Sequence, residues 1–232
     1  MFTICHQCVR DVTAMLEYRW LNHGIAYVPV LELVVHDFDH ALDVFKRTHQ
    51  KHNLPGHFGR RDTLDAVWPA GLPRTQEMDA LYLHHTPSGI KMQTGLSPMR
   101  LHGLDTLQKG QIGYRWTSTS PGMLLSAAWP TAHVVIMDEA GGGNPIIAVT
   151  DAPGTPVLAR IDAGTAFPIA GSMADFFLAM AALIDIVYGE FDVFDVGDDD
   201  GLSEAFLARL TEQVEPILGK ENCARFVDCF YG

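Results

Sequence analysis

The stretch Gly141-Gly-Gly-Asn-Pro-Ile-Ile-Ala-Val-Thr-Asp151 opens the part of the chain that decides the fold. Two β-branched runs, residues 146–150 and 157–161, are separated by the turn-rich sequence Asp-Ala-Pro-Gly-Thr-Pro, which is typical of two adjacent antiparallel strands. A third apolar run, residues 133–137, joins this pair through the glycine-rich connection. Three strands in sequence predict an antiparallel meander, with strands near 132–137, 145–150 and 156–162.

A helix is predicted directly after these strands, beginning within about two residues of Met173. Ser172 occupies the N-cap position, and Asp175 is placed to bond back to the cap amide as in a capping box. Gly189 offers a left-handed end to this helix. Apolar residues recur between these limits at helical spacing: Phe176, Met180, Leu183, Ile184 and Val187. We therefore expect an α+β fold in which helices flank a mainly antiparallel sheet, with helical extensions at both ends.

This order of parts resembles the SUKH superfamily, the fold of cell-wall assembly regulator proteins and of many bacterial toxin-immunity proteins. Three matching features lie around the predicted hairpin: Gly141 to Gly143 before a strand ending in Asp151, the Pro156-Val157 strand, and Ile169-Ala-Gly-Ser172 leading into Phe176-Phe177-Leu178. Three more lie upstream and match the family's Leu-Pro entry and first helix: Leu72-Pro73, Leu81-Tyr82-Leu83 and Ser88-Gly89. The resemblance covers residues 62–185.

The resemblance implies a SUKH-like core at residues 62–188, an α/β extension at 1–61, and an acidic loop with C-terminal helices at 189–232. It also implies a non-enzymatic protein that neutralises a cognate toxin by stoichiometric binding.

Two helices are expected in the N-terminal extension. The first spans residues 7–21, and the second is capped by Asp37 or Asp39. The second helix should turn Ala41, Leu42 and Phe45 inward. It should turn Lys46, Arg47 and His49 toward water.

Composition describes a folded protein, with 47% hydrophobic and 19% charged residues. The sequence shows neither an apolar run long enough to cross a bilayer nor the features of a signal peptide, so we expect a cytoplasmic protein without membrane association. The net charge of -12 is uneven: residues 1–61 hold seven Lys/Arg and six Asp/Glu, whereas residues 62–232 hold nine and twenty-two. This acidity argues against nucleic acid as a partner and favours a basic protein; the alternative is that it serves solubility alone.

Acidity is concentrated after the central helix, where residues 185–204 hold eight carboxylates and no Lys, Arg or His. We call residues 190–200 the acidic segment. Two interpretations remain open: a solvated loop in which Asp200 caps the next helix, or a contact surface for a basic partner. A calcium loop is excluded because Val196 and Leu207 occupy ligand positions. The candidate partner-binding residues are Glu190, Phe191, Asp192, Phe194, Asp195, Asp198, Asp199 and Asp200.

Trp116 is a ninth candidate, because it flanks a Ser/Thr/Pro-rich loop; its alternative role, like that of Trp129, is in the core. The residues after the acidic segment, 202–230, predict two helices packed on the core. Their apolar spacing runs through Phe206, Leu210, Val214, Ile217, Phe226 and Phe230.

Two sets of residues have metal-ligand spacing. Cys5 and Cys8 could join Cys223 and Cys229 in a zinc site if the termini meet, although the last two also fit a packed helix face. His36 and His40 stand one helical turn apart and could both face a metal; the alternative is that they belong to a solvated helix N-terminus. The sequence shows no nucleophile elbow, phosphate loop or dinucleotide fingerprint. We therefore expect a binding protein that uses no cofactor; the alternative is a metal-dependent hydrolase or a zinc-stabilised protein.

Overall fold

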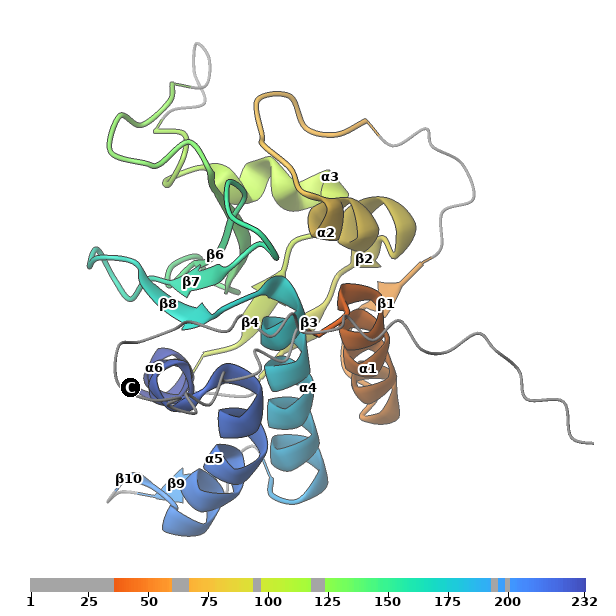
Figure 1. The fold of residues 1–232 in the computed structure, drawn as a ribbon, viewed down its shortest axis with the longest axis vertical. Helices are drawn as coiled ribbons and strands as arrows, with labels where there is room; N and C mark the ends of the chain where they lie inside the picture. Colours follow the sequence, from red (N-terminus) through yellow and green to blue (C-terminus); the bar gives the residue numbers. More distant parts are fainter. Residues whose placement is uncertain (1–35, 60–66, 94–96, 118–123, 193–195, 199–200) are drawn as a thin grey trace, which may run out of the picture. The chain divides into compact units, whose positions relative to one another are not determined.

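A meander of short antiparallel strands forms the central sheet, as the alternating β-branched runs predict (Figure 1). Its strand order is β3-β4-β5-β6-β7-β8, so each strand pairs with its neighbours in the chain. The structure is a computed structural model that describes residues 36–59, 67–93, 97–117, 124–192, 196–198 and 201–232. The strands are β3 (Lys91–Met92), β4 (Met99–Leu101), β5 (His133–Glu139), β6 (Ile146–Val149), β7 (Val157–Ala159) and β8 (Phe167–Ala170).

The predicted α+β class is confirmed, and the three strands predicted around Gly141 correspond to β5, β6 and β7. The expected helix is α4 (Met173–Gly189), which begins at the predicted residue with Ser172 as its N-cap. Its end differs from the prediction, because Gly189 is still helical and Glu190 is the C-cap. The capping box is also incomplete: the Ser172 hydroxyl accepts from Asp175 N at 3.0 Å, but the Asp175 carboxylate is bonded to His36.

The two faces of the sheet carry different side chains. Residues 146, 148, 157 and 159 belong to the large core, whereas Ile147 and Val135 belong to a small second cluster with Trp129. Pairing between β5 and β6 shifts between Val135 and Met137, so Ile136 forms a bulge. Because the bulge inserts one residue, Ile136 and Met137 both reach the large core. Asp138 therefore turns to the second face, beside its cross-strand neighbour Arg100.

Helix α4 is buried along most of its surface because it packs between α1 (Phe38–Lys51), α5 (Glu204–Leu218) and the sheet (Figure 1). The rings of Phe45 and Phe177 meet edge to face at 5.0 Å between centroids. Both Lys51 Nζ and His52 Nε2 lie 2.7 Å from Asp185 Oδ1. Helix α1 therefore belongs to the same compact unit as the sheet, His36–Gly232.

Asp37 caps α1, and Ala41, Leu42 and Phe45 are buried, as predicted. The prediction that His49 faces water is wrong. His49 is 2% exposed, and its Nε2 lies 3.1 Å from the carbonyl oxygen of Pro55. Helix α1 is followed by a tight turn that folds back over its last residues, and this turn covers the histidine.

The two predicted C-terminal helices are α5 and α6 (Lys220–Tyr231), and both pack on the core. Phe206, Leu210 and Val214 are fully buried on α5. The predicted cap of α5 is wrong, because Ser203 and not Asp200 is the N-cap, and its hydroxyl accepts from Phe206 N. No helix among the described residues is both long and apolar enough to span a bilayer.

The remaining elements are short. They are the paired strands β1 (His57–Phe58) and β2 (Pro87–Ser88), the paired strands β9 (Gly197–Asp198) and β10 (Gly201–Leu202), helix α2 (Gln76–Asp79) with its π-helical continuation η1 (Ala80–His84), helix α3 (Leu104–Leu107), and the 3₁₀ turn η2 (Lys109–Gln111).

Candidate functional site

The acidic segment leaves α4 through two residues that fix it to α5. Glu190 accepts two hydrogen bonds from Arg209, from Nε at 2.7 Å and from Nη2 at 2.8 Å. The paired guanidinium lowers the pKa of Glu190. The Phe191 ring meets Phe206 edge to face, 5.5 Å between centroids. Both residues were predicted to contact a partner, and in the structure both hold the start of the segment in place.

A small hairpin closes the other end of the acidic segment. Strand β9 pairs with β10 through Asp198 and Gly201, and Ser203 N donates to Val196 O at 3.0 Å. Val196 and Leu202 pack partly buried against the core. Of the other predicted contact residues, Asp192 is exposed, and Phe194, Asp195, Asp199 and Asp200 lie outside the described residues. The backbone of Asp198 is in β9.

Few cations offset the carboxylates of this end of the chain. Residues 185–232 hold twelve Asp/Glu and three Lys/Arg. Two of the three cations are already paired: Arg209 bonds Glu190 and Glu212, and Arg225 Nη2 lies 2.6 Å from Glu221 Oε1. Asp185 is paired with Lys51 and His52 of the α1 end. Even so, the sequence of this region holds far more carboxylates than cations.

Trp116 lies in the large core and is 4% exposed. Trp129 is 9% exposed and packs in the second cluster. Of the two roles considered for these tryptophans, the core role is confirmed for both. The ring of Trp116 is therefore not presented to a partner in this conformation.

The residues with metal-ligand spacing are not brought together among the described residues. His36 Nδ1 lies 2.6 Å from Asp175 Oδ1, an ion-pair partner that the sequence did not identify. Cys223 is buried on the packed face of α6, and burial raises the pKa of the Cys229 thiol to about 12. Across the described residues, no group of three or more His, Cys, Asp and Glu side chains lies close enough to hold a metal. Cys5 and Cys8 lie outside this part of the chain.

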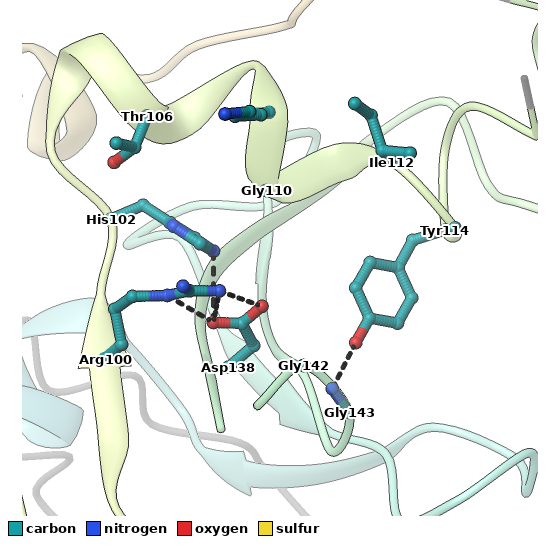
Figure 2. Close-up of a pocket in the computed structure, with 11 residues that line it drawn as sticks. Arg100, His102, Thr106, Gly110, Ile112, Tyr114, Asp138, Gly142 and Gly143 are labelled. Carbon is teal, nitrogen blue, oxygen red and sulfur yellow. Dashed lines mark hydrogen bonds and ion pairs between the residues drawn. The ribbon is translucent and has the colours of Figure 1, made fainter. Parts of the chain in front are cut away.

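A pocket of about 540 Å³ lies on the second face of the sheet, and the sequence did not predict it. It is formed by β4, the end of β5, the segment from α3 to Tyr114, and the turn between β5 and β6. Figure 2 shows Arg100, His102 and Asp138 grouped on one side of this pocket, and Tyr114 on the other with its hydroxyl directed at Gly143.

The floor of the pocket is a buried carboxylate with two basic neighbours. Arg100 donates to Asp138 through Nε and Nη2, each at 3.0 Å. His102 Nε2 lies 3.4 Å from Asp138 Oδ1. The side chains of His102 and Asp138 are 2% and 5% exposed, whereas that of Arg100 is 37% exposed. Arg100 therefore reaches the solvent side of the group, and the other two side chains support it from below.

Gln111 fixes the opposite wall to the sheet. Strand β4 ends at Leu101, so the backbone of β5 beyond this point lacks a neighbouring strand on that side. The fully buried Gln111 amide takes its place: Nε2 donates to Val135 O at 2.8 Å, and Oε1 accepts from Val135 N at 2.9 Å. Nε2 also donates to Leu107 O at 2.9 Å. The turn that carries Lys109 and Gly110 is thereby held against β5.

No protein-family model, no curated protein and no solved structure matches this chain.

Proposed function

We propose that this protein acts by stoichiometric binding of a basic protein partner, through a surface centred on the acidic segment. The observation that carries the proposal is the construction of the segment. Its two ends are fixed to the core, at Glu190 and Phe191 and at the β9–β10 hairpin, while residues 192–204 hold six carboxylates and no cation. Fixing the ends lowers the ordering cost of binding, and a segment rich in carboxylates steers a positive partner.

The resemblance to the SUKH superfamily extends this proposal to an immunity protein that neutralises a bacterial toxin domain, such as a basic nuclease. In that role the protein would need no catalytic residues or cofactor. Occupation of the toxin's cationic surface by carboxylates would suffice, because the same surface binds the phosphates of nucleic acid.

The test uses purified residues 1–232 and each basic toxin-like domain that a neighbouring gene is found to encode. Titration calorimetry should give a saturable complex of fixed stoichiometry, and the toxin's activity should fall to zero at the same molar ratio. Loss of activity only at a large excess of this protein, or no saturable heat for any neighbouring product, would contradict the proposed function.

A further inference from the structure

We propose that the pocket on the second face of the sheet binds a small organic anion, a carboxylate or phosphate ester, whose charged group is held by Lys109 and Arg100. The proposal is independent of the acidic segment and of any protein partner. The size of the pocket suits such a ligand, because pockets for small molecules span roughly 300–1,000 Å³ and this one measures about 540 Å³.

The first argument is that the pocket has donors to spare. Among the described residues, no group accepts a hydrogen bond from Lys109 Nζ or from Arg100 Nη1. The Tyr114 oxygen accepts from Gly143 N at 3.1 Å, so the phenolic hydrogen is left to donate. Burial raises the pKa of Tyr114, which keeps the phenol protonated at neutral pH.

The second argument is that the side-chain oxygens of Asp138 and Thr106 in the pocket are already engaged. Asp138 receives both hydrogen bonds of Arg100 and lies at ion-pair distance from His102. The Thr106 hydroxyl accepts from Gly103 N and donates to Gly103 O. Spare donors beside side-chain oxygens that are already engaged are complementary to a ligand rich in acceptors, and a carboxylate or phosphate is such a ligand.

The third argument comes from His102. Its side chain is 2% exposed, and neither ring nitrogen has a hydrogen-bond partner among the described residues. Buried polar atoms are normally satisfied, so an unsatisfied one calls for an explanation, and a bound ligand or ion is one such explanation. The ring stands directly behind Gly110, where an added Cβ would lie 2.3 Å from His102 Nε2. Any larger residue at position 110 would displace the histidine ring.

The remaining lining explains why the ligand should be organic. Ile112 is 39% exposed and borders the pocket, and the Tyr114 ring faces it from the same wall (Figure 2). Gly142 and Gly143 line the rim with backbone alone, so a ligand can approach closely there. An inorganic ion would leave most of this space unfilled. A ligand with an apolar or planar body would cover Ile112 and Tyr114 while its charged group meets Lys109 and Arg100.

The experiment follows histidine ring and backbone resonances of residues 1–232 by NMR during titration with four probes: phenyl phosphate, benzoate, inorganic phosphate and benzylamine. We expect saturable shifts at His102, Gly110 and Gly143 with phenyl phosphate or benzoate, at dissociation constants of about 1 mM or below. The stronger of these two probes identifies the anionic group. Inorganic phosphate should bind more weakly than phenyl phosphate, and benzylamine should not bind.

Lys109→Glu is the decisive variant, because Lys109 is exposed and no described residue takes a hydrogen bond from its ammonium group. Anion affinity should fall about tenfold or more, the usual effect of removing a charge-assisted contact. Lys91→Glu makes the same charge change at an exposed strand residue outside the pocket and should leave affinity within about twofold. Equal losses in the two variants, no saturable shift with either organic anion, or equally strong binding of benzylamine would overturn the proposal.

Discussion

Replacing Gln111 with methionine tests how the wall of the pocket is attached to the sheet. Methionine is similar in length and apolar, so Gln111→Met should remove the hydrogen bonds with little change in volume. Three backbone groups would lose a partner: Val135 N–H, Val135 C=O and Leu107 C=O. Each buried group left without a partner costs about 1–3 kcal/mol, and neighbouring losses are not fully additive. The expected loss of unfolding free energy is roughly 3–6 kcal/mol.

Urea denaturation followed by circular dichroism measures this loss, and thermal unfolding should show a Tm lower by roughly 10 °C for a domain of this size. Gln93→Met is the matched control. Gln93 is exposed, and its hydrogen bonds with Tyr188 use only its backbone, so the control should change stability by less than about 0.5 kcal/mol. If Gln111→Met costs less than about 1 kcal/mol, the amide does not secure this segment to β5 and the reasoning fails.

Two further predictions concern the helical layer. Burial alone would raise the pKa of Asp185, but hydrogen bonds from Lys51 and His52 outweigh burial and lower the pKa. The ionised carboxylate therefore adds to the free energy of unfolding above its unfolded pKa of about 3.9, and this contribution is lost as the pH falls through the lower folded pKa. Wild type should be more stable than Asp185→Asn at pH 6, and the difference in unfolding free energy should shrink below about pH 4. A difference that stays constant down to pH 2 would show that the charge of Asp185 is not its source. Leu210→Ala removes a fully buried side chain of α5, the helix that packs on α4, and should lower the free energy of unfolding by about 2–5 kcal/mol, measured by urea denaturation. The control Leu207→Ala, at a half-buried position of the same helix, should lower it clearly less. A chain truncated after Gly189 should be insoluble or destabilised, because the core surface under α5 and α6 would be exposed; unchanged stability would refute the packing of these helices.

The parts of the fold predicted correctly from the sequence are those set by local signals. Strands β5, β6 and β7 follow from β-branched runs and turn residues, and the start of α4 follows from the Ser172 cap. The errors occur where a distant residue competes for a side chain. Asp175 bonds His36 across 139 residues instead of completing its capping box. His49 lies on the outer face of a predicted helix, but the carbonyl of Pro55 and the turn that carries it enclose it.

The pocket could not be predicted because it depends on strand register. Arg100 and Asp138 are 38 residues apart, and they face each other only because β4 pairs with β5 in one register and Ile136 forms a bulge. A slip of one residue would place Asp138 on the opposite face. The acidic segment was visible in the sequence because it depends on composition alone. The anchoring role of Glu190 and Phe191 could not be predicted, because it depends on where α5 places Arg209 and Phe206 in space.

The most direct test of the proposed function is the salt dependence of association between this protein and the basic partner that the proposed calorimetric titration identifies. The association rate is measured by stopped flow from 50 mM to 500 mM salt for wild type, for Asp198→Lys with Asp199→Lys, and for the control Asp43→Lys with Asp151→Lys. The control makes the same total charge change at exposed positions on α1 and on the turn after β6. If the acidic segment forms the interface, the Asp198/Asp199 variant should associate at least about tenfold more slowly at low salt with a flatter salt dependence, and the control should stay close to wild type. Equal rates and equal salt slopes for the two double variants would contradict the claim and reduce the acidic segment to a determinant of solubility.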